Sequence, residues 1–98
     1  MEKGGVKIKA TKIRMHDGME KSNSVLEIKD IYITGAAQDK YYPKENVHDF
    51  IENHPNTTIK VDIYPYPKLI AATKGSQKYV RSEANDSIHD NLLKLPRV

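Results

Sequence analysis

The alternation of apolar and polar residues in the first third of the chain constrains the fold most, because it changes phase twice. In residues 6–15 the apolar positions move from even to odd residue numbers near residues 10–11, and in residues 24–34 they move the same way near residues 29–30. Alternation with a period of two is typical of β-strands, and one extra residue in a strand is a β-bulge that bends it. The sequence therefore predicts two long strands that form a strongly bent hairpin.

Two later segments have the apolar spacing of short helices. Residues 43–53 place apolar side chains three and four positions apart, and Pro43 suits a first helical position because its missing N–H costs nothing there. Residues 87–95 repeat this spacing. Ser87 followed three residues later by Asp90 matches the capping box that starts many helices. We therefore predict Ser87 and Asp90 as a structural helix cap.

The remaining strand patterns complete an α+β fold. Residues 57–64 alternate regularly, and residues 69–73 and 77–82 predict a hairpin across a short connection that contains glycine. The expected order is β-β-α-β-β-β-α: an antiparallel sheet of about four to five strands with two short helices packed on it. We expect one domain over residues 6–96, after a flexible N-terminal tail at residues 1–5.

Composition narrows the class of protein. The chain has 98 residues, of which 38% are hydrophobic and 30% charged, so it allows one small domain with a modest core. It has no cysteine, which excludes disulfides and thiolate metal sites and fits a reducing cytoplasm. We find neither a signal-peptide pattern nor a membrane span. We therefore expect a soluble cytoplasmic protein, either a monomer or a weak homodimer.

The positive charge is concentrated in two segments. The net charge is +3, but residues 1–15 and 67–82 are strongly basic and flank an acidic middle. If the first and last strands lie side by side, they form a surface that could bind nucleic-acid phosphates. The other interpretation is that lysines on an exposed strand keep an edge soluble and unpaired. The candidate phosphate-binding residues are Lys7, Lys9, Lys12, Arg14, Lys68, Lys74, Lys78 and Arg81.

The aromatic residues are six tyrosines and one phenylalanine. Tyr64 lies out of phase with Ile59, Val61 and Ile63, so it should point away from the core. Tyrosine combines an apolar body with a polar tip, which suits a protein interface or stacking against unpaired bases. Tyrosine also simply favours half-buried strands. We select Tyr64 and Tyr66 as candidate partner-binding residues.

The C-terminal third resembles a known family. Lys78-Tyr79-Val80-Arg81-Ser82, followed by Asp90-Asn91-Leu92-Leu93-x-Leu95-Pro96, resembles the closing signature of a small bacterial family called domain of unknown function 3892. The resemblance spans roughly residues 6–96 and is sharp over 74–96. The chain departs from it at Tyr42-Pro43, where the family more often has a Ser or Thr helix cap, and in a longer loop at 35–42. The resemblance implies a domain of this extent and a bacterial source, but no activity.

This family-like segment also holds the group most like a site. Arg81 could clamp an anionic ligand beside Asn91, or pair with a carboxylate to fix the loop. We find no catalytic, metal-binding or cofactor-binding pattern, and a small core leaves little room for a deep pocket. We therefore expect a non-catalytic protein-interaction module with Tyr64, Tyr66, Arg81 and Asn91 as partner-binding candidates. A nucleic-acid-binding domain is the alternative, and a small enzyme is the third.

Overall fold

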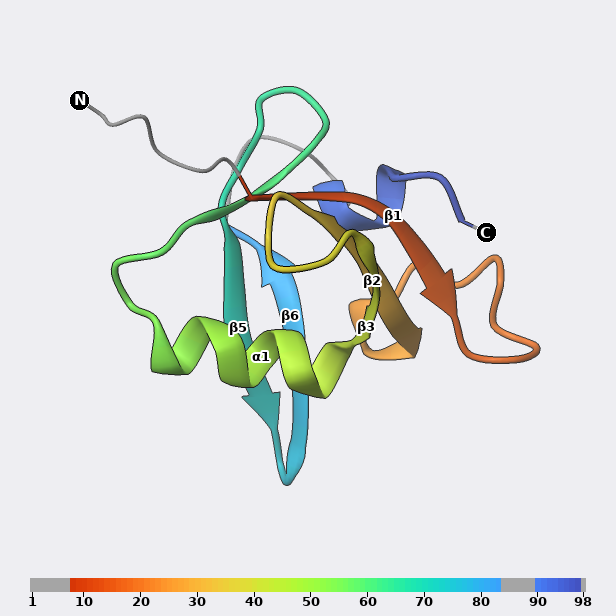
Figure 1. Cartoon of the computed structure of the whole chain (residues 1–98). Helices are drawn as coiled ribbons and strands as arrows, with labels where there is room; N and C mark the ends of the chain where they lie inside the picture. Colours follow the sequence, from red (N-terminus) through yellow and green to blue (C-terminus); the bar gives the residue numbers. More distant parts are fainter. Residues whose placement is uncertain (1–7, 84–89, 98) are drawn as a thin grey trace.

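The computed structural model describes residues 8–83 and 90–97, and within them it confirms an α+β domain (Figure 1). Four strands form one sheet in the order β3-β2-β1-β4, and two further strands form a separate hairpin, β5-β6. The bounds are β1 Ile8–Met15, β2 Ile28–Thr34, β3 Lys40–Pro43, β4 Ile59–Val61, β5 Leu69–Lys74 and β6 Gln77–Ser82. One α-helix, α1 (Lys44–Asn53), and two 3-10 turns, η1 (Val25–Glu27) and η2 (Asn91–Lys94), complete the described elements.

The two predicted phase shifts are confirmed as irregularities in the β1–β2 pairing. Ala10 pairs with Ile33 and Lys12 with Tyr32, so Thr11 is an extra residue in β1. The second shift leaves Lys29 as an extra residue in β2. Each bulge keeps the buried side of its strand facing the core while the strand bends. The segment before β2 does not extend the strand, because residues 25–27 form the 3-10 turn η1.

The first strand is central in the sheet. β1 runs antiparallel to β2 and parallel to β4, so the sheet is mixed, whereas the sequence predicts an antiparallel one. An isolated parallel bridge also joins Ile13 to Arg97, and the backbone N–H of Ile13 donates to the Pro96 carbonyl at 2.9 Å. Strand β1 therefore contacts segments from the start, the middle and the end of the described chain.

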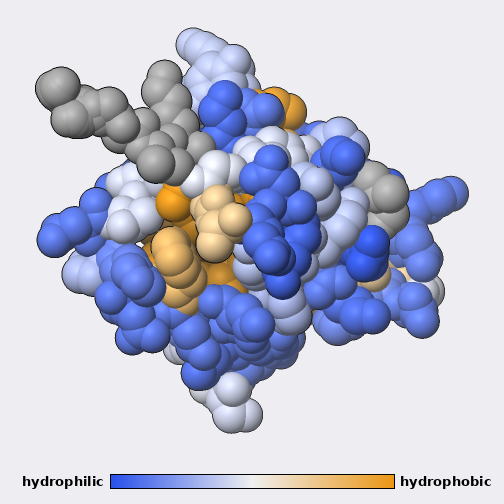
Figure 2. Space-filling view, in the orientation of Figure 1, coloured by the Kyte–Doolittle hydropathy of each residue, from blue (hydrophilic) through white to orange (hydrophobic). Residues whose placement is uncertain are grey.

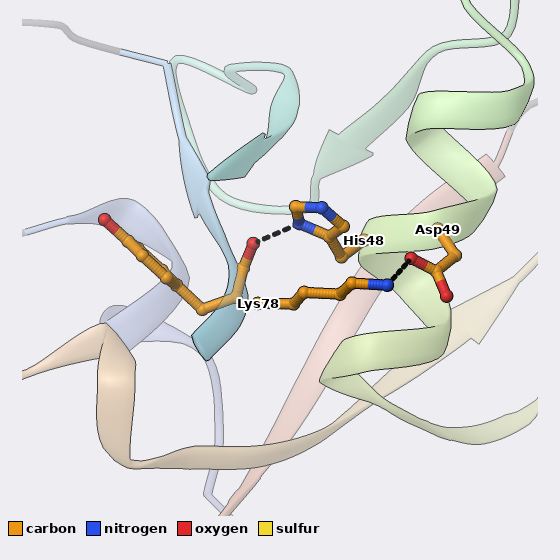
Figure 3. Close-up of polar contacts among 4 residues, drawn as sticks. His48, Asp49 and Lys78 are labelled. Carbon is orange, nitrogen blue, oxygen red and sulfur yellow. Dashed lines mark hydrogen bonds and ion pairs between the residues drawn. The ribbon is translucent and has the colours of Figure 1, made fainter. Parts of the chain in front are cut away.

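Helix α1 packs against the β5–β6 hairpin and also contacts β2 and β3 (Figure 1). Figure 3 shows His48 and Asp49 facing β6: His48 Nδ1 lies 3.1 Å from the Tyr79 carbonyl oxygen, and Lys78 Nζ lies 2.9 Å from an Asp49 carboxylate oxygen. Pro43 is the last residue of β3 and the N-cap of α1, and its side chain makes no capping hydrogen bond. The helix therefore begins at Lys44, one residue later than predicted.

One hydrophobic cluster joins all these parts. Its fully buried members include Ile13, Ile28 and Ile31 from the sheet, Val80 from the hairpin and Leu92 from η2. Apolar burial of this kind is the main favourable term in folding. Both sheets and the C-terminal turn therefore share one core.

Three predicted elements differ from the structure. Strand β3 lies largely in the segment expected to be a loop. The sequence does not predict this strand, because Lys-Tyr-Tyr-Pro shows no alternation of apolar and polar residues. The strand expected over 57–64 is only β4, since turn hydrogen bonds take over at Ile63. Of the helix expected over 87–95, residues 91–94 form the 3-10 turn η2, while Ser87 and the other residues of 84–89 lie outside the described residues.

Candidate functional site

Two exposed tyrosines lie on the loop between β4 and β5. Tyr64 has 80% of its surface exposed and Tyr66 has 52%, which confirms that Tyr64 points away from the core. Their rings meet edge to face with centroids 6.1 Å apart. Such a pair presents a connected aromatic surface together with two hydroxyl groups.

Backbone hydrogen bonds close this loop at its base. The Val61 N–H donates to the Pro67 carbonyl at 2.8 Å, and an antiparallel bridge joins Lys60 to Lys68. Within the loop, the Tyr66 N–H donates to the Ile63 carbonyl at 2.7 Å. These contacts fix the path of the chain between the two strands.

Tyr66 adopts the left-handed backbone region, with φ at 60°. This conformation costs a residue with a side chain about 1–2 kcal/mol, so it persists only where surrounding contacts enforce it. A non-glycine residue at positive φ, carrying an exposed ring, is the kind of local strain that clusters at functional sites.

Asn91 supports the loop from inside the protein. Its side chain is 0% exposed, and its amide Nδ2 donates to the Tyr64 carbonyl at 3.1 Å. Its backbone N–H donates to the Ser82 hydroxyl oxygen at 3.2 Å. Asn91, predicted as a partner-binding residue, is therefore buried and positions the tyrosine loop from inside the protein.

The other residues of the family-like segment form a local hydrogen-bond network. Asp90 is the N-cap of η2, where it accepts from the Leu92 N–H at 2.9 Å and from the Ser82 hydroxyl at 2.7 Å. Arg81 is half-buried and donates from Nη1 to the Ser82 carbonyl at 3.2 Å. In this arrangement Asp90 ties η2 to the end of β6.

The candidate phosphate-binding residues do not meet on paired strands. A shared phosphate-binding surface required the first and last strands to lie side by side, but β1 and β6 belong to different sheets. Their separation follows from the pairing of β1 with β2 and β4, which occupies both of its edges. Lys7 lies outside the described residues, and Lys68 and Lys74 are exposed near the ends of β5.

Most of the described cations in this set already contact carboxylates or tyrosine rings. Lys9 lies 4.0 Å from Asp62, and Lys78 lies 2.9 Å from Asp49. On the sheet, Lys12 Nζ lies 4.9 Å from the centre of the Tyr32 ring, and the Arg14 guanidinium lies 4.0 Å from that of Tyr41. Arg14 is also 3.5 Å from Asp30.

Sequence reasoning missed two features. The structure has an apolar cavity of about 320 Å³ beside α1, although the small core was expected to leave little room for one. It also buries Lys44, which is 2% exposed and donates from Nζ to the Leu26 carbonyl at 2.6 Å. No local pattern in the sequence indicates either feature, because each depends on segments brought together by folding.

Neither a cluster of metal ligands nor a membrane-spanning helix is found among the described residues. No three His, Cys, Asp or Glu side chains gather there as metal ligands do. Within the same residues, none of the helices has the length and apolar composition needed to cross a bilayer.

These observations define a small α+β domain that presents a preformed aromatic loop. Residues 8–96 match the model of the family described as Protein of unknown function (DUF3892). The chain therefore belongs to this family, as its C-terminal signature predicts. No curated protein and no solved structure matches it.

Proposed function

We propose that this domain is a non-catalytic protein-interaction module whose contact surface centres on Tyr64 and Tyr66. The observation that carries the proposal is the combination of exposed rings with a fixed backbone, since Tyr66 is held at positive φ and the Tyr64 carbonyl is bonded to buried Asn91. Tyrosine is enriched at the centres of protein interfaces, and a preformed loop loses little conformational entropy on binding.

The paired cations of strand β1 favour a protein partner over nucleic acid. Asp62 lies at the start of the loop, and its carboxylate is 4.0 Å from the Lys9 ammonium. The charge of Lys9 is therefore partly balanced by that carboxylate. A nucleic-acid surface needs cations that are free to replace counterions, but Lys12 and Arg14 cover tyrosine rings. Nucleic-acid binding is therefore the alternative function, and the binding experiment distinguishes it from protein binding.

The cellular setting is part of the same proposal. The absence of cysteine from the sequence supports a reducing cytoplasm, and the family resemblance supports a bacterial source. We propose a monomer or weak homodimer that works without a cofactor.

The test compares ring-deleting variants with a matched control. Tyr66→Asn removes a ring while keeping a residue that tolerates positive φ, and Tyr64→Ser removes the more exposed ring. Met19→Ser is the control, because Met19 is another exposed large apolar residue, at 38%. Proteins captured from the source cells by the wild-type chain are identified and their affinities are measured by calorimetry.

We expect the identified partner to bind the control normally and each tyrosine variant at least about tenfold more weakly. We also expect that affinity to change little between low and moderate salt. Equal binding by all variants would refute the assignment to this loop. Binding to mixed DNA and RNA probes that falls steeply with salt would establish the nucleic-acid alternative instead.

A further inference from the structure

The cavity beside α1 is built almost entirely from apolar side chains. The ends of three strands supply Ile8, Ile33 and Ile59, and α1 supplies Val47 and Phe50. Figure 2 shows an apolar patch on this face with hydrophilic surface to its right and below it. Its volume of about 320 Å³ corresponds to about ten groups the size of a water molecule or a methylene. Apolar cavities half that size bind small hydrocarbons.

Two polar residues are among those that line the cavity. Tyr42 and Asn46 line the cavity, and Lys40 Nζ lies 5.2 Å from the centre of the Tyr42 ring. The Tyr42 hydroxyl already donates to the Gln38 carbonyl at 2.7 Å. The nearby Asp39 carboxylate accepts from the Gly35 N–H at 3.1 Å. The Asn46 amide in the cavity lining and the Lys40 ammonium beside the Tyr42 ring are therefore the groups suited to an anionic head group.

We propose that this cavity binds an unbranched aliphatic carboxylate of about eight carbons, with the chain among the isoleucines and the carboxylate beside Lys40 and Asn46. The volume fits one such chain, and the apolar lining matches its methylenes. The ammonium of Lys40 matches the charge of its head. This site is separate from the tyrosine loop, and the inference is independent of the proposed function.

The test uses octanoate, with 1-octanol as an uncharged ligand of the same chain length, and isotope-labelled full-length protein in a nuclear magnetic resonance titration. We expect saturable shifts centred on Val47, Phe50 and Ile59. The expected dissociation constant is about 0.1–1 mM, which is reasonable for ten non-hydrogen atoms. Failure to saturate by about 10 mM, or shifts spread over the whole surface, would overturn the proposal.

Variants test the position of the ligand. Ala36→Leu and Ala37→Leu each place three extra carbon atoms at the cavity. Each displaced methylene lowers affinity about fourfold, so displacing three should weaken octanoate binding about sixtyfold. Ala72→Leu on β5, outside the cavity, is the matched control and should bind normally. Because Ala37 is exposed, its variant should fold even if the Ala36 variant does not. Unchanged affinity in the folded cavity variants would refute the site.

Lys40→Gln tests the head group. We expect octanoate affinity to fall about twofold to fivefold, the range for an exposed ion pair, while 1-octanol binds as before. An equal loss for both ligands, or no loss for either, would contradict the assigned role of Lys40.

Discussion

Replacing Asn91 with alanine should destabilise the whole domain and release the tyrosine loop. The side chain is 0% exposed and its amide holds the Tyr64 carbonyl at 3.1 Å. Loss of one buried hydrogen bond costs about 1 kcal/mol, and the vacated space in a closed core adds about 1 kcal/mol. The expected total is about 2 kcal/mol, a large share of the 5–15 kcal/mol typical of a folded domain.

Equilibrium unfolding in urea measures this loss directly. With a slope of about 1 kcal/mol per molar urea for a chain of this size, the midpoint should fall by about 2 M, and the melting temperature by about 8–16 °C. Asn23→Ala is the control, because Asn23 is exposed, and its midpoint should move by less than about 0.5 M.

Hydrogen exchange separates the local effect from the global one. The Tyr66 N–H, bonded to the Ile63 carbonyl at 2.7 Å, should exchange faster in the Asn91 variant than the global loss of stability explains. A midpoint change below about 0.5 M, with unchanged exchange at Tyr66, would refute the assignment of Asn91 as the support of the loop.

Three further predictions use the same urea assay. Lys44→Ala should cost about 2 kcal/mol, because it removes a buried charged donor from the Leu26 carbonyl; a loss below about 0.5 kcal/mol would contradict this. Asp49→Asn should cost less than about 1 kcal/mol, since its pair with Lys78 is half exposed, and a larger loss would show a stronger bond. Gly75→Ala should cost about 1 kcal/mol from φ at 61° alone, because nothing lies within 4 Å of an added Cβ; a stable variant would refute that reasoning.

The local sequence pattern predicts those features of the fold that depend only on neighbouring residues. Both bulges follow from a phase shift in alternation, because burying one face of a strand requires an extra residue when the apolar positions change parity. Tyr64 is exposed as the parity argument predicts, although it lies in the turn after β4 and outside the strand that the argument assumed. The hairpin around Gly75 follows from glycine in a short connection.

Features that depend on contacts between distant segments cannot be predicted from the local sequence pattern. Strand β4 runs parallel to β1 because α1 returns the chain to the sheet, and nothing within residues 59–61 encodes that direction. Asp90 fits a capping box in the sequence, yet it caps η2 itself and bonds Ser82 from β6. Asn91 is a partner-binding candidate by its position in the signature, whereas its burial under the loop is a tertiary property.

The central place of β1 has a consequence for how the protein forms during synthesis. This strand leaves the ribosome before its parallel neighbour β4 and well before Arg97, which bridges to Ile13. Until then the β1–β2 ribbon has an unpaired inner edge and an uncovered apolar face, and such intermediates are prone to aggregate. Because these contacts join residues far apart in sequence, folding should be slow for a domain of this size. A ribosome-bound chain halted before β4 should therefore need a chaperone to stay soluble.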